Sequence, residues 1–155
     1  MRERINKDDY YLNIAEVVAQ RSTCLRRMYG AVIVKNDEII STGYNGAPRG
    51  RANCSDTGFC LRKMLQIPSG ERYELCKSVH GEANAIISAS RRDMIGSSLY
   101  LGKIIPAGEN SDTEFPECCS MCKRLILNAG IIKVISRNSH GKIRVIIPQE
   151  EWISE

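Results

Sequence analysis

The chain has 155 residues, enough for a sizeable core, and we expect a single domain over 1–155. Its hydrophobic content of 43% and charged content of 26% are ordinary for a globular protein. No apolar run reaches the roughly 18 residues of a membrane span, and the polar N-terminus lacks the apolar core of a signal peptide. The formal charge of +4 suits a small anionic substrate as well as a nucleic acid, so charge alone excludes neither.

The predicted elements begin with a helix over 10–20, whose apolar residues recur on one side. A hairpin follows, with β-branched strands over 30–34 and 38–42, and a glycine-rich loop occupies 43–50. The remaining predicted elements are a helix over 80–91, a strand over 98–101, a helix over 119–128 and strands over 131–136 and 143–147. Strands alternating with helices predict an α/β fold with a central mixed sheet covered by helices.

A polar segment over 51–79 interrupts this pattern, and we call it the cysteine-rich insertion. It contains Cys54, Cys60 and Cys76, and its residue pattern predicts one short helix over 61–66. The insertion has too few apolar residues to be ordered by hydrophobic packing alone, so we expect another kind of interaction to order it.

The chain has seven cysteines, and none of its predicted features indicates secretion. We therefore expect a cytoplasmic protein, in a compartment that keeps thiols reduced. An odd count also leaves at least one thiol unpaired in any disulfide scheme. The cysteines thus indicate metal binding or catalysis rather than disulfides.

One histidine and two cysteines give the strongest chemical signal. Residues three apart on a helix face the same side, so Cys119 and Cys122 can bind one metal ion. Together with His80 they make three ligands for a tetrahedral zinc, which leaves the fourth position to water. Glu82 follows His80 by two residues and is placed to accept a proton from that water.

Each of these residues also has a simpler interpretation. A histidine at a helix start is usually a cap or a surface group, and a glutamate in a first turn usually interacts with the helix dipole. A lone Cys-x-x-Cys pair is also typical of redox sites and structural zinc sites. The combination favours a catalytic zinc site. His140 lies in Asn-Ser-His-Gly, a composition typical of a turn, and we assign it no function.

Beyond these motifs, five stretches closely resemble the deoxycytidylate (dCMP) deaminases of the cytidine deaminase-like superfamily. They are residues 21–24, 30–34, 41–46, 80–86 and 128–131. The resemblance extends over about 10–136 and implies a three-layer α/β/α fold with a mixed sheet of about five strands. It also implies zinc-dependent conversion of dCMP to dUMP, in which hydroxide attacks C4 of cytosine, Glu82 moves the proton and ammonia leaves.

The resemblance implies substrate contacts as well. Asn45 would contact the sugar 3′-hydroxyl, and Ser22 and Arg26, with Arg27 as a further candidate, would lie near the phosphate. Gly81 would border the base. A basic stretch of this kind is a reasonable source of phosphate ligands. The alternative is that the two arginines form an exposed, solvated face.

The same resemblance implies a homo-oligomer, a hexamer or a dimer, and regulation by dCTP and dTTP. A small nucleotide is then the expected partner, whereas a membrane and a nucleic acid are not.

The chain departs from the usual family pattern at two places. Gly81 replaces the alanine of His-Ala-Glu, and two residues, Glu117 and Cys118, separate Pro116 from the Cys-x-x-Cys pair. We expect the glycine to loosen the helix start and enlarge the base pocket. The second change removes proline from its place beside the first cysteine ligand, so reduced activity or an altered base preference stays open.

Four cysteines remain once Cys118 and the two zinc ligands are set aside. Some members of the family hold a structural zinc in the corresponding insertion. We therefore expect Cys24, Cys54, Cys60 and Cys76 to bind a second, structural zinc in a closed tetrahedral site. The alternative is four separate, small, buried side chains.

Two other functions stay open from the sequence. One is deamination of another cytosine nucleoside or nucleotide, or of tRNA, although the cysteine-rich insertion counts against tRNA. The other is a non-catalytic module that keeps the fold to bind zinc or nucleotides, an alternative that the two departures keep open.

Overall fold

A hairpin forms one edge of the central sheet in the computed structural model, which describes residues 1–111 and 114–154. β1 (Met28–Lys35) and β2 (Glu38–Tyr44) pair in antiparallel fashion. Asn36 and Asp37 between them have φ angles of 51° and 61°. Asn and Asp tolerate this left-handed conformation better than most residues, and it matches the twist of the two strands. The predicted hairpin is confirmed, with both strands longer than expected.

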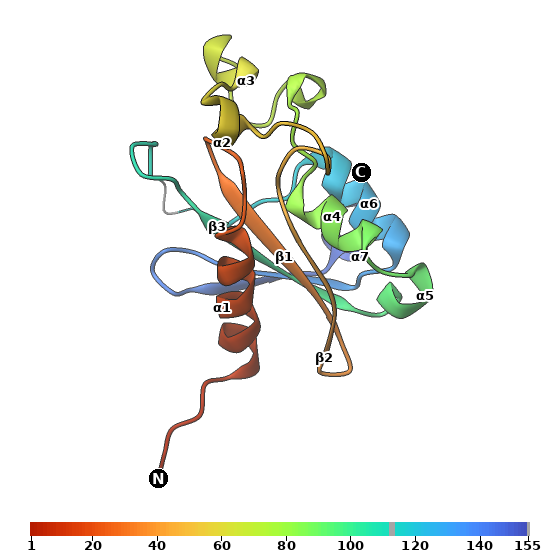
Figure 1. Cartoon of the computed structure of the whole chain (residues 1–155). Coiled ribbons are helices and arrows are strands. Elements are labelled where there is room, and N and C mark those ends of the chain that lie inside the picture. The colour runs from red at the N-terminus through yellow and green to blue at the C-terminus, as the bar shows by residue number, and fades with distance from the viewer. Residues whose placement is uncertain (112–113, 155) are drawn as a thin grey trace.

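Three further strands complete a five-stranded mixed sheet. β3 (Ser98–Ile104) pairs antiparallel with β1, β4 (Lys133–Arg137) runs parallel to β3, and β5 (Ile143–Ile146) is antiparallel to β4. The strand order is β2-β1-β3-β4-β5 (Figure 1). This arrangement confirms the predicted α/β fold with a mixed sheet.

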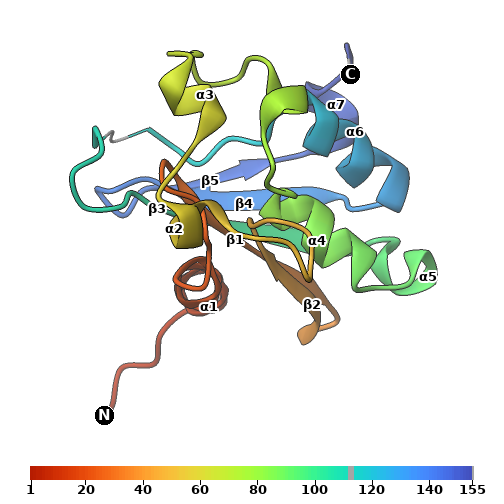
Figure 2. The same cartoon turned by 45° about the horizontal axis from the view of Figure 1, so that its top comes forward.

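Helices cover both faces of the sheet and make three layers. Successive residues of a strand point to opposite faces, and Val32 and Val34 pack in the core cluster that includes Leu12 of α1 (Lys7–Ala19). Ala31 and Ile33 belong to the larger cluster on the other face. That face is covered by α4 (Gly81–Ile87), α5 (Arg91–Met94), α6 (Ser120–Ala129) and α7 (Pro148–Glu151) (Figure 2).

The predicted single helix over 80–91 is wrong, because α4 ends at Ile87 and α5 begins at Arg91. The side chain of Ser90 accepts a hydrogen bond from the backbone N–H of Asp93 and so caps the second helix. Serine side chains compete with the helical hydrogen bonds of the backbone and favour caps over helix interiors. The small α7 was not predicted.

The cysteine-rich insertion lies at one end of the sheet (Figure 1). It contains two single-turn helices, α2 (Cys54–Thr57) and α3 (Leu61–Met64), and the 3₁₀ helix η1 (Tyr73–Leu75). The helix predicted over 61–66 therefore exists but ends earlier. None of the helices in the described residues is long and apolar enough to cross a membrane.

Helix α4 packs directly against strand β2. A Cβ atom added at Gly43 would lie 2.3 Å from the Ala85 nitrogen and 2.4 Å from the Gly81 oxygen, so only glycine permits this approach. The Ser41 hydroxyl donates to the Ala85 carbonyl at 2.7 Å, and Asn84 Nδ2 donates to the Tyr44 carbonyl at 2.8 Å. These contacts fix the start of α4 relative to the sheet.

Candidate active site

The starts of two helices bring three metal-ligating side chains together. His80 is the N-cap of α4 and Cys119 is the N-cap of α6, while Cys122 lies in the first turn of α6. His80 Nδ1 is 3.4 Å from the Sγ atom of Cys119 and 3.4 Å from that of Cys122. All three ligand atoms lie within 4.8 Å of one another.

These distances fit a zinc ion. Zinc–sulfur bonds of about 2.3 Å and a zinc–nitrogen bond of about 2.1 Å at a tetrahedral angle place nitrogen and sulfur about 3.6 Å apart. Two sulfurs and one imidazole nitrogen also match the ligand types that zinc prefers. In the part of the chain that the structure describes, this is the one cluster of three or more such residues close enough to share an ion.

The electrostatics of the trio favour a thiolate at Cys119. Hydrogen bonds from Cys122 and from His80 lower the pKa of Cys119 to about 4. The pKa of His80 is raised, chiefly by its hydrogen bond with Cys119. The pKa of Cys122 is raised as well, first by its hydrogen bond with Cys119 and then by burial. Cys119 is therefore the thiol that ionises first.

Glu82 lies beside the trio and is almost entirely buried. Its residue is 3% exposed, and burial raises the pKa of its carboxyl group. A hydrogen bond from Cys122 and the charge of His80 act in the opposite direction. A buried carboxyl group with a raised pKa can both accept and return a proton near neutral pH.

The segment before Cys119 is held by strand β5. Arg144 stacks its guanidinium carbon 4.7 Å from the ring centre of Phe115, and its Nη2 donates to Glu117 at 2.5 Å. Cys118 is buried, which raises the pKa of its thiol. The two residues that separate Pro116 from the ligands are thus anchored in place, and α6 begins after Cys119 without an adjacent proline.

A cavity of about 90 Å³ opens beside Glu82 and His80. Arg26, Arg27 and Asn45 also line it, so the structure brings these predicted substrate residues to the same place as the metal ligands. Two arginine side chains give this end of the site a positive charge, which suits a phosphate.

Most of the hydrogen-bonding groups of the Asn45 side chain are bonded to other residues of the protein. Its Oδ1 accepts from the Ser22 hydroxyl at 2.5 Å and from the Tyr29 backbone N–H at 2.8 Å. Its Nδ2 donates to the Arg27 carbonyl at 2.9 Å. One N–H of the amide is left for a ligand. Ser22 itself does not line the cavity and lies behind Asn45.

Comparison with known proteins agrees with this geometry. A family model described as the cytidine and deoxycytidylate deaminase zinc-binding region matches residues 5–137. The chain belongs to this deaminase family. It is 39% identical over 133 residues to the deoxycytidylate deaminase of Mycobacterium phage D29, covering 83% of this chain and 91% of that protein.

Other relatives extend the comparison. The deoxycytidylate deaminase of Schizosaccharomyces pombe is 31% identical over 90% of this chain, but the chain spans only 39% of its length. The apo dCMP deaminase of cyanophage S-TIM5 is a structural neighbour with a TM-score of 0.57 and 28% identity, covering 85% of this chain and 82% of that one. A second structure of that enzyme, in complex with dCMP and dUMP, has a TM-score of 0.54 and 26% identity, covering 86% of this chain and 82% of that one. These neighbours confirm the deaminase fold.

The packing of Gly81 differs from our expectation for this departure from the family pattern. A Cβ atom at this position would lie 3.2 Å from the backbone oxygens of Gly43 and Tyr29. Backbone therefore already borders the space that the alanine methyl would take. The glycine allows α4 to approach the sheet closely, and this packing does not support the expected enlargement of the base pocket.

The four remaining cysteines gather on one side of this deaminase site. Cys24, Cys60 and Cys76 line the cavity that contains Glu82, and the charges of these three thiols contribute, after burial, to the raised pKa of Cys54. All four are unpaired and partly buried. Within the described residues, no three of their sulfur atoms come as close together as the His80 trio.

Five residues that line this cavity were not predicted from the sequence: Tyr29, Arg62, Ser69, Tyr73 and Ser78. Tyr29 and Tyr73 also border a second cavity of about 560 Å³ that reaches Cys119. Tyr29 follows the basic stretch over 21–27 and could have been inferred from that neighbourhood. Arg62 and Tyr73 lie in the cysteine-rich insertion, whose irregular path gives no periodic signal.

His140 is exposed, and its backbone N–H donates to Asn138 Oδ1 at 3.1 Å in the turn before β5. The predicted turn is confirmed.

Proposed function

We propose that this protein deaminates dCMP to dUMP and releases ammonia. The observation that carries the proposal is the buried Glu82 carboxyl group beside the converging His80, Cys119 and Cys122 side chains. The relatives named deoxycytidylate deaminase and the neighbour solved with dCMP and dUMP support cytosine deoxynucleotides as substrates.

Each residue of the site then has a distinct role. His80, Cys119 and Cys122 would hold a zinc ion, which would supply the acidity that activates a water molecule. Glu82 would accept one proton from that water and deliver it to the ring nitrogen of cytosine, then accept the second proton from the new hydroxyl on C4 and deliver it to the departing amine. The overall reaction consumes one water and one dCMP and yields dUMP and ammonia. The apolar burial of Glu82 keeps bulk water from competing for the proton.

The phosphate binds at the arginine-lined part of the cavity. Arg26 and Arg27 supply charge, while Ser22 holds Asn45, whose remaining amide N–H faces the sugar. Arg26 Nη1 donates to the Ile67 carbonyl at 3.3 Å, a long bond that a phosphate oxygen can replace.

An ammonia-release assay with dCMP, CMP and deoxycytidine tests this function. We expect dCMP to exceed deoxycytidine in kcat/KM by at least about tenfold, because the nucleoside cannot make charge-assisted bonds to the arginines. Glu82→Gln should reduce kcat for dCMP by about 100-fold or more while zinc stays bound, because glutamine cannot carry the proton.

Two results would contradict the proposal. A parent protein inert towards every cytosine nucleotide would favour a non-catalytic module. Equal turnover of deoxycytidine and dCMP would instead indicate a nucleoside deaminase.

We also propose a second, structural zinc bound by Cys24, Cys54, Cys60 and Cys76. Its support is the gathering of four unpaired thiols, three of them in the cysteine-rich insertion, where Ile67 is the one buried apolar residue among those that the structure describes. Unpaired thiols are also typical of a reducing compartment, and we place the protein in the cytoplasm on that ground.

Counting zinc per chain after exhaustive dialysis tests the second site. We expect about two equivalents for the parent, and about one for either Cys54→Ser or Cys119→Ser. Cys54→Ser should also lower the melting temperature more than Cys118→Ser, since Cys118 is no ligand in this scheme. One equivalent in the parent, unchanged by Cys54→Ser, would contradict it.

We propose a homo-oligomer, either a hexamer or a dimer. Support comes from three apolar side chains on the outer surface of the adjacent helices α4 and α6: Ile87, Met121 and Leu125, of which Ile87 is 72% exposed. Large apolar side chains exposed on neighbouring helices are typical of contact surfaces. Light scattering should give a mass of two or six chains for the parent, and a smaller mass for Ile87→Asp. A monomeric parent would contradict the proposal.

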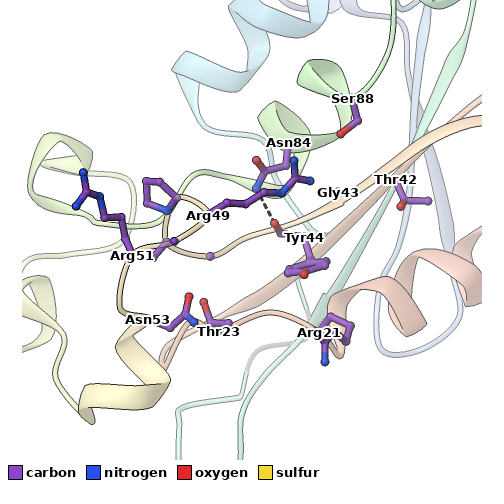
Figure 3. A pocket seen from close by; sticks show the side chains of 14 residues that line it. Arg21, Thr23, Thr42, Gly43, Tyr44, Arg49, Arg51, Asn53, Asn84 and Ser88 are labelled. Atoms are coloured by element: carbon purple, nitrogen blue, oxygen red, sulfur yellow. Dashed lines mark hydrogen bonds between the residues drawn. The ribbon is translucent and has the colours of Figure 1, made fainter.

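We further propose dCTP and dTTP as effectors, binding at a separate cavity of about 410 Å³ that is lined in part by the loop over 46–51 (Figure 3). Arg21, Arg49 and Arg51 line it and suit a polyphosphate. Asn84 of α4 also lines it, and α4 begins next to Glu82, so a ligand there touches the helix that carries the site.

Rates at subsaturating dCMP with each triphosphate added test this regulation. We expect dCTP and dTTP to change the rate in opposite directions by at least about fivefold. Arg49→Met should remove most of this response and leave the basal rate within about twofold. A rate unchanged by either triphosphate would contradict it.

A further inference from the structure

Arg62 is a buried cation that forms no salt bridge with an acidic side chain of the described residues. Its Nε and Nη2 donate to the Glu71 carbonyl at 3.2 and 2.8 Å, and Nη2 also donates to the Pro68 carbonyl at 2.9 Å. A buried guanidinium needs such partners, and its rigid, planar shape suits two carbonyls on one loop. Arg62 thereby fixes the path of residues 68–71.

The same guanidinium lies over the ring of Tyr73. The Arg62 Cζ atom is 4.5 Å from the ring centre, a cation–π contact. The Tyr73 hydroxyl accepts a hydrogen bond from the backbone N–H of Gly70 at 3.1 Å, within the loop that Arg62 holds. The ring is therefore fixed both across its face and at its hydroxyl.

Tyr73 in turn meets the ring of His80. The two ring centres are 4.9 Å apart and the planes cross at 88°, a T-shaped contact. His80 directs Nδ1 towards Cys119 and Cys122, while no described residue accepts a hydrogen bond from its Nε2. Metal-binding histidines are usually oriented by a hydrogen bond at the second nitrogen.

We propose that Arg62 and Tyr73 position the imidazole of His80 for zinc binding, through the aromatic contact rather than through a hydrogen bond. The proposal rests on the zinc site of the proposed function. It assigns a task to the cysteine-rich insertion, because both side chains come from it. Tyr73 acts on the chemistry only through His80 and is a positioning residue.

Two cysteines of the insertion lie next to the short helices that carry Arg62 and Tyr73. Cys60 is the N-cap of α3, which carries Arg62, and Cys76 is the C-cap of η1, which starts at Tyr73. Two of the four proposed structural-zinc ligands thus flank the pair. Arg62 also lines the cavity beside Arg26, so direct contact with the substrate phosphate is the competing role.

Tyr73→Leu and Tyr73→Phe separate these roles, with Phe59→Leu as the matched control, an exposed ring elsewhere in the insertion. Zinc loss to a chromogenic chelator reports on the site, and the phase of interest is the one that Cys119→Ser removes. For Tyr73→Leu we expect that phase to be about 10–100-fold faster, with kcat for dCMP lowered similarly and KM within about threefold. Tyr73→Phe and Phe59→Leu should stay within about threefold of the parent in all three quantities.

The visible spectrum of the cobalt-substituted protein gives a second readout. It reports ligand geometry and should shift for Tyr73→Leu but not for Tyr73→Phe. If Tyr73→Leu does not fold, Arg62→Met serves the same test, since it removes the cation behind the ring, with Arg72→Met as its exposed control. Arg62→Met should then speed zinc loss and shift the spectrum in the same direction.

Two outcomes would overturn the proposal. One is parent-like zinc loss and cobalt spectrum in Tyr73→Leu, or in Arg62→Met where the first variant does not fold. The other is a large rise in KM with kcat unchanged, which would assign the pair to substrate binding. A parent that binds zinc but does not turn over dCMP would refute the proposed function, while zinc loss and the spectrum would still decide the role of Tyr73.

Discussion

The close contact between helix α4 and strand β2 is the constraint on which the site depends. Gly43 lets the backbone of the helix lie against the backbone of the strand, and Ser41 and Asn84 bond across the same contact. Because His80 is the N-cap of α4, this contact sets the position of one metal ligand. The other two come from the N-cap and the first turn of α6, which packs on the same face of the sheet. Two helix starts supported by one sheet thus produce a three-ligand site, and Glu82 follows as the next buried side chain of α4.

Several elements of the fold and part of the metal site could be predicted from the sequence, because they depend on residues that are close together in the chain. The hairpin follows from β-branched strands on either side of Asn36 and Asp37. The proximity of Cys119 and Cys122 at one metal site follows from their spacing of three residues at the start of a helix. The approach of these two cysteines to His80 depends on the tertiary fold, which local patterns do not predict. The resemblance to deaminases predicted it instead. The break after Ile87 was missed because two serines near the end of α4 compete with the helix, which periodicity does not register.

The contribution of the cysteine-rich insertion could not be read from the sequence. Its polar composition predicts a surface loop, and nothing local indicates that Arg62 is buried or that Tyr73 lies against His80. Both contacts arise from an irregular backbone held by side-chain to carbonyl bonds. The contact of Glu117 with Arg144 could not be predicted either, because Arg144 lies far along the chain, in the last strand of the sheet. Long-range polar contacts of this kind leave no periodic trace in the chain.

The central claim is that one zinc ion is held by His80, Cys119 and Cys122 with Glu82 free to move a proton. Anomalous diffraction at the zinc edge, on crystals of the protein as purified, tests it most directly. We expect a peak about 2.0–2.3 Å from His80 Nδ1 and from both Sγ atoms, with the Glu82 carboxylate outside bonding distance of the metal. A map without a peak at that position, or with Glu82 itself bound to the ion as a ligand, would contradict it.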